Sequence, residues 1–276
     1  MTRDQIINAL IEMLLAEMPE MKLSASKVKS KRKLLRALMN VRPPAPIQPS
    51  FLKLQDQLLQ MEATDKGVVF IDQIPTVEEM FGAMKSARTP EARKIAVVRR
   101  KIRLWQGDIT RLKVDAIVNA ANSQLLGCFI PCHNCIDNAI HSAAGLELRQ
   151  ACCELMTKQD HEEPIGRAKI TPAFNLPSKF VIHTVGPIVS GQLTVDDEKM
   201  LAQCYLSCLK LAVKKNLSSI AFCCISTGEF HFPNERAAQI AVDTVKNFLI
   251  DNSIEVVFNV FKDLDLTVYQ KILGGL

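Results

Sequence analysis

The chain has 276 residues, 48% of them hydrophobic, and a formal net charge of +5 at pH 7. This length and hydrophobic content suffice for a sizeable core, in one large domain with an extension or in two domains. No apolar run reaches the roughly 18 residues of a membrane span, and the start lacks a basic stretch followed by an apolar one. We therefore exclude membrane and exported proteins and expect a soluble, intracellular protein of the cytoplasm.

The cysteine pattern supports a reducing compartment. The chain has nine cysteines, an odd number, and none of the even spacing of a secreted disulfide framework. Six of them fall at apolar positions, where a free thiol behaves as a small hydrophobe, and we assign them no chemistry. These six are Cys152, Cys153, Cys204, Cys208, Cys223 and Cys224.

Residues 1–95 predict a helical N-terminal extension. Thr2 and Gln5 form a capping pattern ahead of apolar residues at helical spacing, which indicates a helix over residues 2–16. Further helices are predicted over 26–40, ending at a proline-rich stretch, and over about 50–62. A short strand over 68–71 and a helix around 76–85 follow. The apolar helix faces need a partner, so we expect the extension to pack on the rest of the chain.

A basic cluster lies within this extension. Residues 27–36 contain six basic side chains and no acidic one. Such a cluster could meet a phosphate backbone or an acidic protein. No aromatic residues interleave with the bases as stacking platforms would, so a solvated helix face is the favoured interpretation and nucleic acid is not an expected partner.

After Pro90 the pattern alternates between strands and helices, which is typical of an α/β fold. Short apolar runs predict strands over 102–105, 116–118, 180–183, 219–225 and 255–260. Helical periodicity falls between them, over about 137–157, 197–215, 233–251 and 266–273. A largely parallel or mixed sheet follows, and ligands of such sheets bind beyond the carboxyl ends of the strands.

Three loops at predicted strand ends are candidate binding elements. Residues 107–110 (Gly-Asp-Ile-Thr) place a carboxylate after a tight turn, although the same residues also suit a plain turn. Residues 118–122 (Val-Asn-Ala-Ala-Asn) offer amides beside small residues. Residues 226–230 (Ser-Thr-Gly-Glu-Phe) lead into a helix, whose N-terminal N–H groups could bind a phosphate. They lack the Gly-Lys-Ser/Thr ending of a Walker loop.

A metal site is predicted by Cys128, His133 and Cys135, a C-x4-H-x-C cluster. Thiolates with an imidazole select Zn²⁺ over Mg²⁺ or Ca²⁺. Three protein ligands leave an open position, as in catalytic sites. The alternative is a closed structural site in which Cys132 or a cysteine of the 223–224 pair supplies the fourth ligand.

Taken in order, the segments GDIT, VNAAN, DNAIHSAAG, VIHTVGP and ISTGEFHFP resemble the macrodomain family over residues of about 100–275. Residues 127–137 stand where most macrodomains carry a glycine-rich run. In this respect the chain resembles the zinc-dependent, sirtuin-linked branch of MacroD-like protein-ADP-ribose hydrolases, which also has a helical extension. The resemblance implies a three-layer α/β/α sandwich with a mixed central sheet over residues 96–276, and one Zn²⁺ per chain.

The resemblance also implies roles for individual residues. The adenine amine would contact Asp108, a phosphate would contact the Ile109 amide, and the distal ribose would contact Asn122. Asp137 or the ligand's own phosphate would activate water, making Asn122 and Asp137 the catalytic candidates. The full ADP-ribose-binding set is Asp108, Ile109, Asn122, Cys135, Ile136, Asp137, Ser226, Thr227, Gly228, Glu229 and Phe230.

The expected function is zinc-dependent hydrolysis of mono-ADP-ribose from modified protein side chains, with an ADP-ribosylated protein as substrate and free ADP-ribose as product. The open metal position would take a ribose hydroxyl or the attacking water. The alternative is a non-catalytic ADP-ribose reader with a structural zinc. His141 and His183 lie in apolar surroundings and are interpreted as core residues, whereas His231 is a weak candidate beside the phosphate loop.

Overall fold

A six-stranded mixed sheet forms the centre of the molecule. The computed structural model describes residues 1–21, 29–83 and 89–276. The sheet has the order β2-β8-β7-β4-β6-β5, and β5 alone runs antiparallel to its neighbour. Its strands are β2 (Ile102–Gln106), β4 (Ala116–Ala121), β5 (Ala168–Pro172), β6 (Phe180–Val185), β7 (Ser219–Phe222) and β8 (Glu255–Val260).

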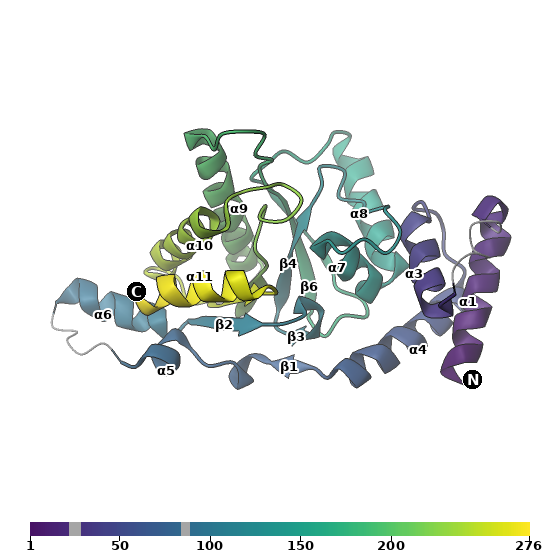
Figure 1. The fold of residues 1–276 in the computed structure, drawn as a ribbon, viewed down its shortest axis with the longest axis horizontal. Helices are drawn as coiled ribbons and strands as arrows, with labels where there is room; N and C mark the ends of the chain where they lie inside the picture. The colour runs from purple at the N-terminus through teal and green to yellow at the C-terminus, as the bar shows by residue number, and fades with distance from the viewer. Residues whose placement is uncertain (22–28, 84–88) are drawn as a thin grey trace.

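Helices cover both faces of the sheet, which makes the three-layer sandwich that the sequence predicted (Figure 1). On one side lie α9 (Val195–Lys214), α10 (Asn234–Leu249) and α11 (Asp263–Gly274). On the other lie α7 (Ile136–Ala144) and α8 (Leu146–Gln159), of which α7 packs on β4 and α8 on β5. The mixed α/β fold class is therefore confirmed.

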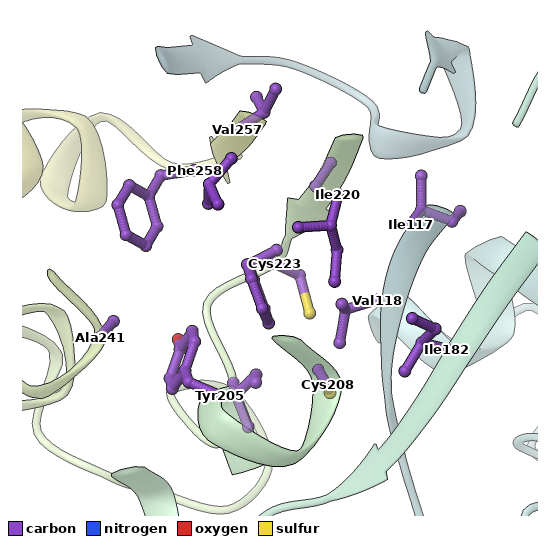
Figure 2. Close-up of a cluster of buried hydrophobic side chains, with 14 of the residues drawn as sticks. Ile117, Val118, Ile182, Tyr205, Cys208, Ile220, Cys223, Ala241, Val257 and Phe258 are labelled. Carbon is purple, nitrogen blue, oxygen red and sulfur yellow. The ribbon is translucent and has the colours of Figure 1, made fainter. Parts of the chain in front are cut away.

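The core between these layers is apolar and tightly filled. Figure 2 shows Ile117, Val118 and Ile182 of the sheet together with Tyr205 and Cys208 of α9 in one cluster of buried side chains. All five side chains are at most 1% exposed. The parallel strands are buried on both faces and therefore read as continuous apolar runs rather than alternating ones.

The N-terminal helices build a second apolar cluster. It is formed mainly by α1 (Arg3–Glu17), α3 (Lys31–Val41) and α4 (Pro49–Lys66), with a short 3₁₀ turn, η1 (Pro19–Met21), after α1. Thr2 and Gln5 make the reciprocal capping box predicted for α1. Leu146 of α8 belongs to this cluster, so the helices dock on the α7–α8 side of the sandwich. The predicted second helix began at residue 26, and residues 22–28 lie outside the described part of the chain.

From α4 the chain runs along the edge of the sandwich to its far side (Figure 1). It passes through β1 (Val69–Phe70), η2 (Ile71–Gln73), α5 (Val77–Phe81) and α6 (Pro90–Arg99). The strand β1 pairs in parallel with β3 (Leu112–Lys113), which follows η3 (Ile109–Arg111). Residues 95 and 96, where the sequence suggests the boundary between extension and macrodomain, both lie within α6.

Several features differ from the predicted elements, among them the short strand β3. The expected helix over 137–157 is two helices, because Gly145 adopts a φ of +99° that L side chains rarely adopt. A Cβ there would also meet the Gln55 side chain of α4 at 2.5 Å. The strand β5 and helix α6 were not predicted. Within the described ranges, no helix has the length and apolar character needed to cross a lipid bilayer.

Candidate active site

A cavity of about 1000 Å³ opens where the predicted loops gather, beyond the carboxyl ends of β2, β4, β7 and β8. A cavity of this volume can enclose a large ligand. The structure brings the predicted metal-ligating and ADP-ribose-binding residues to its wall, whereas the weak candidate His231 is not among the lining residues. The predicted residues on the wall are Asp108, Ile109, Asn122, Cys128, His133, Cys135, Ile136, Asp137, Ser226, Thr227, Gly228, Glu229 and Phe230.

Asp108 lies at the start of η3, directly after β2. Its Oδ1 accepts hydrogen bonds from Thr110 N at 3.0 Å and Thr110 Oγ1 at 2.6 Å. Its Oδ2 lies 3.1 Å from Lys66 Nζ at the end of α4. Although burial raises the pKa of Asp108, these partners outweigh it and hold the pKa below 3.8. The residue is therefore a carboxylate at neutral pH, and a residue of the N-terminal extension already contacts it.

Asn122 follows β4 and organises the loop that leads to α7. Its Oδ1 accepts from Gln124 N at 3.1 Å, and its Nδ2 donates to Gly127 O at 3.2 Å. Gly127 has a φ of +82°, and a Cβ there would meet the His141 ring at 2.9 Å. Asn122 thus fixes a tight loop at the cavity wall, where its amide is placed to meet a ligand.

Asp137 lies in the first turn of α7, only 5% exposed and yet on the cavity wall. Its Oδ1 accepts a 2.7 Å hydrogen bond from Asn119 Nδ2. Burial raises the pKa of this carboxyl to about 6, against the opposing effects of Asn119 and of the positive charge of Arg149. A carboxyl group with a pKa near 6 is ionised at neutral pH and can exchange a proton close to it, as a general base must.

Two buried histidines surround Asp137. His183 is a satisfied core residue, with Nε2 2.9 Å from Thr171 Oγ1 and Nδ1 3.3 Å from Asn119 Nδ2. His141 differs from this expectation, since among the described residues neither of its ring nitrogens has a hydrogen-bond partner. Its Nε2 lies 3.4 Å from Asp137 Oδ1. Burial holds the pKa of His141 well below 6.5, so the ring is neutral beside the carboxylate.

Cys128, His133 and Cys135 meet in the loop between β4 and α7. Their sulfur and nitrogen atoms all lie within 4.8 Å of one another, and 3.7 Å separates Cys128 Sγ from His133 Nδ1. A tetrahedral zinc ion, with bonds of about 2.3 Å to sulfur and about 2.0 Å to nitrogen, separates its ligand atoms by about 3.5–3.8 Å. The three side chains therefore fit such an ion.

The electrostatic surroundings of Cys135 also favour a cation at this site. Cys135 caps α7, where its Sγ accepts from Asn138 N at 3.4 Å. Burial raises the pKa of Cys135, and the neighbouring Cys128 sulfur raises it further. Two adjacent thiolates are costly without a positive charge between them, and a divalent cation would supply that charge.

The proposed fourth ligands lie elsewhere. Cys132 turns toward α3, where its Sγ donates to Lys33 O at 3.3 Å. Cys224 Sγ lies 3.9 Å from Asn259 O, and Cys223 is buried under the sheet end. Within residues 1–21, 29–83 and 89–276, the metal-competent group at this loop comprises Cys128, His133 and Cys135 alone. This arrangement favours three protein ligands over a closed four-ligand site.

The loop over residues 226–230 closes the cavity opposite α7. Ser226 has a φ of +64°, a conformation that costs energy for a non-glycine residue. Its Oγ is buried and has no hydrogen-bond partner within the described chain. A Cβ built on Gly228 would meet no atom within 4 Å, so the loop backbone faces open space. A free hydroxyl and an open backbone are suited to an anionic group such as a phosphate.

Glu229 extends from this loop toward the metal-competent cluster. Its Oε1 lies 3.8 Å from His133 Nε2, the nitrogen opposite the one nearest Cys128. This distance is longer than a hydrogen bond, but it places a carboxylate on the side of the ring from which metal-ligating imidazoles are commonly oriented. The negatively charged Glu229 side chain would repel a diphosphate. The predicted contact of Glu229 with the ligand would therefore be made by its backbone.

The N-terminal extension contributes wall residues that the sequence did not predict. Arg32 and Arg36 of α3, together with Glu62 and Lys66 of α4, line the cavity. Arg32 forms a bidentate ion pair with Glu62, with Nη2 to Oε2 at 2.7 Å. The basic cluster at residues 27–36 signalled Arg32 and Arg36, but their charge was assigned to a solvated face. Lys27 of that cluster lies outside the described residues.

Phe261 is a second unpredicted wall residue. It follows β8 and is 75% exposed. Gln106 Nε2 donates to its carbonyl at 3.4 Å, so it lies beside the loop that carries Asp108. An exposed aromatic ring on the wall of a cavity is a suitable platform for a planar base. Its position directly after an apolar strand was the available signal.

Comparison with known proteins agrees with this geometry. A Macro domain family model matches residues 118–241. The chain is 50% identical over 244 residues to a protein-ADP-ribose hydrolase of Treponema medium, covering 87% of each chain. It is 45% identical over 242 residues to a protein-ADP-ribose hydrolase of Staphylococcus aureus (strain MRSA252), covering 86% of this chain and 83% of the other.

A solved structure shares the fold. The Trypanosoma brucei macrodomain in complex with ADP-ribose is 27% identical, with a TM-score of 0.62, and the match covers 89% of this chain and 97% of that one. The sheet, the cavity at its strand ends and the relatives that match along most of their length agree, and the chain belongs to the macrodomain family.

Proposed function

We propose that this protein hydrolyses mono-ADP-ribose from modified protein side chains, with ADP-ribose bound in the 1000 Å³ cavity. The observation that carries the proposal is Asp137, a buried carboxylate on the cavity wall with a pKa raised to about 6. A pure binding site has no need for a buried group poised to take a proton near neutral pH. The named activities of the relatives at 50% and 45% identity support the same conclusion.

The cavity residues suggest how the substrate would lie. The adenine would meet Asp108 and Phe261, and the diphosphate would meet the Ile109 amide, the Ser226 hydroxyl and the backbone of the phosphate loop. This order brings the distal ribose to Asn122 and Asp137. Four loops from well-separated parts of the sequence, together with the first turn of α7, would thus hold one extended ligand and position its reactive carbon.

In the reaction, the bond between the anomeric carbon of the distal ribose and the protein side chain breaks. The side-chain atom departs with the electron pair of that bond, the oxygen of a water molecule bonds to the anomeric carbon, and Asp137 receives the proton that the water loses. Asn119 holds Asp137 Oδ1, so we assign the other oxygen to the water. The transition state resembles an oxocarbenium ion, which the negative charge of Asp137 stabilises.

We further propose a zinc ion, one per chain, held by Cys128, His133 and Cys135, which would place this protein in the zinc-dependent, sirtuin-linked branch of the family. When bound, the ion would supply a Lewis acid at the wall of the cavity. Glu229 would orient His133, and the N-terminus of α7 would stabilise the Cys135 thiolate.

The partners we propose are an ADP-ribosylated protein as substrate and free ADP-ribose as product, with no role for nucleic acid or membrane. All nine cysteines are free, which is consistent with a reducing, cytoplasmic compartment. We keep residues 1–95 as a helical extension that packs on the zinc-containing macrodomain of residues 96–276.

Metal analysis combined with an ADP-ribose release assay tests the zinc proposal. We expect one zinc per chain, and release from a mono-ADP-ribosylated protein that stops after chelation and returns when zinc is added. Release that is unchanged after complete removal of the metal would contradict a catalytic zinc. Binding of ADP-ribose with no release of it from the modified protein would instead favour a non-catalytic ADP-ribose reader, which could bind the ligand with the same loops.

A further inference from the structure

Helix α3 of the N-terminal extension contacts the loop that carries Cys128, His133 and Cys135. Arg36, in the middle of α3, donates through Nη2 to His133 O at 3.2 Å and to Asn138 Oδ1 at 2.7 Å. Its Nε donates to the same Asn138 oxygen at 3.2 Å. One guanidinium therefore holds the backbone of one metal-ligating residue and the side chain of a residue in the first turn of α7.

Asn138 relays this contact to the rest of the loop. Its Nδ2 donates to Ile130 O at 3.0 Å, and its backbone N–H donates to Cys135 Sγ at 3.4 Å. Asn138 is itself fully buried. Arg36 is thus bonded directly to His133 and, through Asn138, to the segment that positions Cys135.

Asn40, one turn further along α3, contacts the loop at Cys132, whose backbone conformation is energetically unfavourable. Cys132 has a φ of +54°, in the left-handed region that a residue with a Cβ enters at a cost. Its N–H donates to Asn40 Oδ1 at 2.9 Å, and Asn40 Nδ2 donates to Ser142 Oγ of α7 at 3.1 Å. Asn40 is 2% exposed, so this bond is shielded from competing water. The residue in this left-handed conformation directly precedes His133.

We propose that α3 is a positioning element of the metal site, in which Arg36 and Asn40 hold His133 and Cys135 in the geometry that a metal ion needs. The inference rests on the proposed zinc site and extends it to the N-terminal helices. The loop over residues 128–135 contains neither helix nor strand, only a short turn at its centre, and it ends where α7 begins. Its conformation therefore depends on bonds from outside, and α3 supplies bonds at both His133 and Cys132.

Zinc affinity of the full chain tests this role. Arg36→Ala and Asn40→Ala remove the two contacts, and Lys31→Ala removes an exposed charge from the same helix as the matched control. Affinity is measured with zinc alone, by competition with a chromophoric chelator. Outer partners of metal ligands contribute about 10- to 100-fold in affinity, so we expect losses of that size for the first two variants and less than twofold for Lys31→Ala.

Hydrogen exchange of the zinc-free protein provides a second readout. In Arg36→Ala and Asn40→Ala the backbone amides of residues 128–135 should exchange faster than in the wild type. The amides of α9 and the central sheet should stay as protected as in the wild type. Arg36→Lys keeps the positive charge but lacks the planar guanidinium that donates to two acceptors at once. Its zinc affinity and its exchange rates over residues 128–135 should lie between those of the wild type and Arg36→Ala. This milder variant also carries the test if Arg36→Ala does not fold.

Zinc affinities of Arg36→Ala and Asn40→Ala equal to that of Lys31→Ala would overturn the positioning role while leaving the zinc site intact. A wild-type chain that takes up no zinc would overturn both this inference and the metal part of the proposed function. A double-mutant cycle of Arg36→Ala and Asn138→Ala tests the relay. We expect the double variant to lose less affinity than the product of the single losses, and a full product would contradict it.

Discussion

Asp137 shows how environment rather than residue type determines chemistry. A surface aspartate titrates near 3.8, whereas burial raises the pKa of Asp137 to about 6. The bond from Asn119 is itself fixed by His183, whose Nδ1 lies 3.3 Å from the same amide nitrogen. Because that nitrogen donates, His183 Nδ1 accepts, and His183 Nε2 donates to Thr171. A hydrogen-bonded row thus orients the carboxylate from inside the core.

The raised pKa of Asp137 predicts the acid limb of the pH profile. Asp137 accepts a proton only when ionised, so kcat/KM should fall about tenfold per pH unit below about pH 6 and stay level just above it. The measurement is ADP-ribose release between pH 4.5 and 8, with zinc content checked at each pH because acid also protonates metal ligands. A limb that begins near pH 4 would show that the titrating carboxyl is not buried.

At the residue scale, the sequence predicted the identity of the wall residues better than their partners. The order of short segments located Asp108, Asn122, Asp137 and the metal-ligating cluster. It did not reveal that Lys66 contacts Asp108 across 42 positions, or that His141 lacks hydrogen-bond partners among the described residues. Such pairings depend on how distant helices dock, which periodicity does not encode.

The phosphate loop illustrates a constraint at the scale of elements. Ser226, at its start, packs against Gly186, which follows β6. A Cβ on Gly186 would approach Ser226 Oγ to 2.0 Å and Ile225 Cγ2 to 2.9 Å. The close approach of the segments that follow β6 and β7 places the buried Ser226 hydroxyl on the cavity wall, so Gly186 shapes the binding loop although β4 lies between the two strands.

Gly186→Ala should therefore weaken ADP-ribose binding. Overpacking of this kind costs about 1–3 kcal/mol, and if the loop shifts to relieve it we expect a rise in Kd of roughly tenfold or more. Calorimetry with free ADP-ribose measures the change. Gly275→Ala is the control, because a Cβ there meets its nearest atom at an ordinary 3.5 Å. An unchanged Kd would mean that the loop does not depend on this contact.

Element boundaries were predicted well where local signals were strong. The capping box at Thr2 and the prolines after α3 delimit helices as expected. The break at Gly145 was not foreseen because the apolar pattern continues through it. Its cause is tertiary, since Gln55 of α4 fills the space beside Gly145 and accepts from Leu146 N at 2.8 Å. An interior glycine was the available signal.

At the scale of the molecule, the extension and the sandwich share one binding site. Arg149 of α8 donates to Leu126 O at 2.7 Å and to Arg42 O, beyond α3, at 2.6 Å. The loop between β4 and α7, which contains Leu126, thus contacts the sandwich on one side and α3 on the other. Sequence reasoning predicted that the extension packs on the core, but the order of elements along the chain gives no indication that it lines the cavity.

The most direct test of the central claim compares ADP-ribose release from a mono-ADP-ribosylated protein by the wild type and by Asp137→Asn. The substitution preserves the size of the side chain and removes its ability to take a proton. We expect the wild type to release free ADP-ribose and the variant to bind it with similar affinity while releasing it at least about 100-fold more slowly. Equal release by both proteins, or binding without release by the wild type, would contradict hydrolysis at this site.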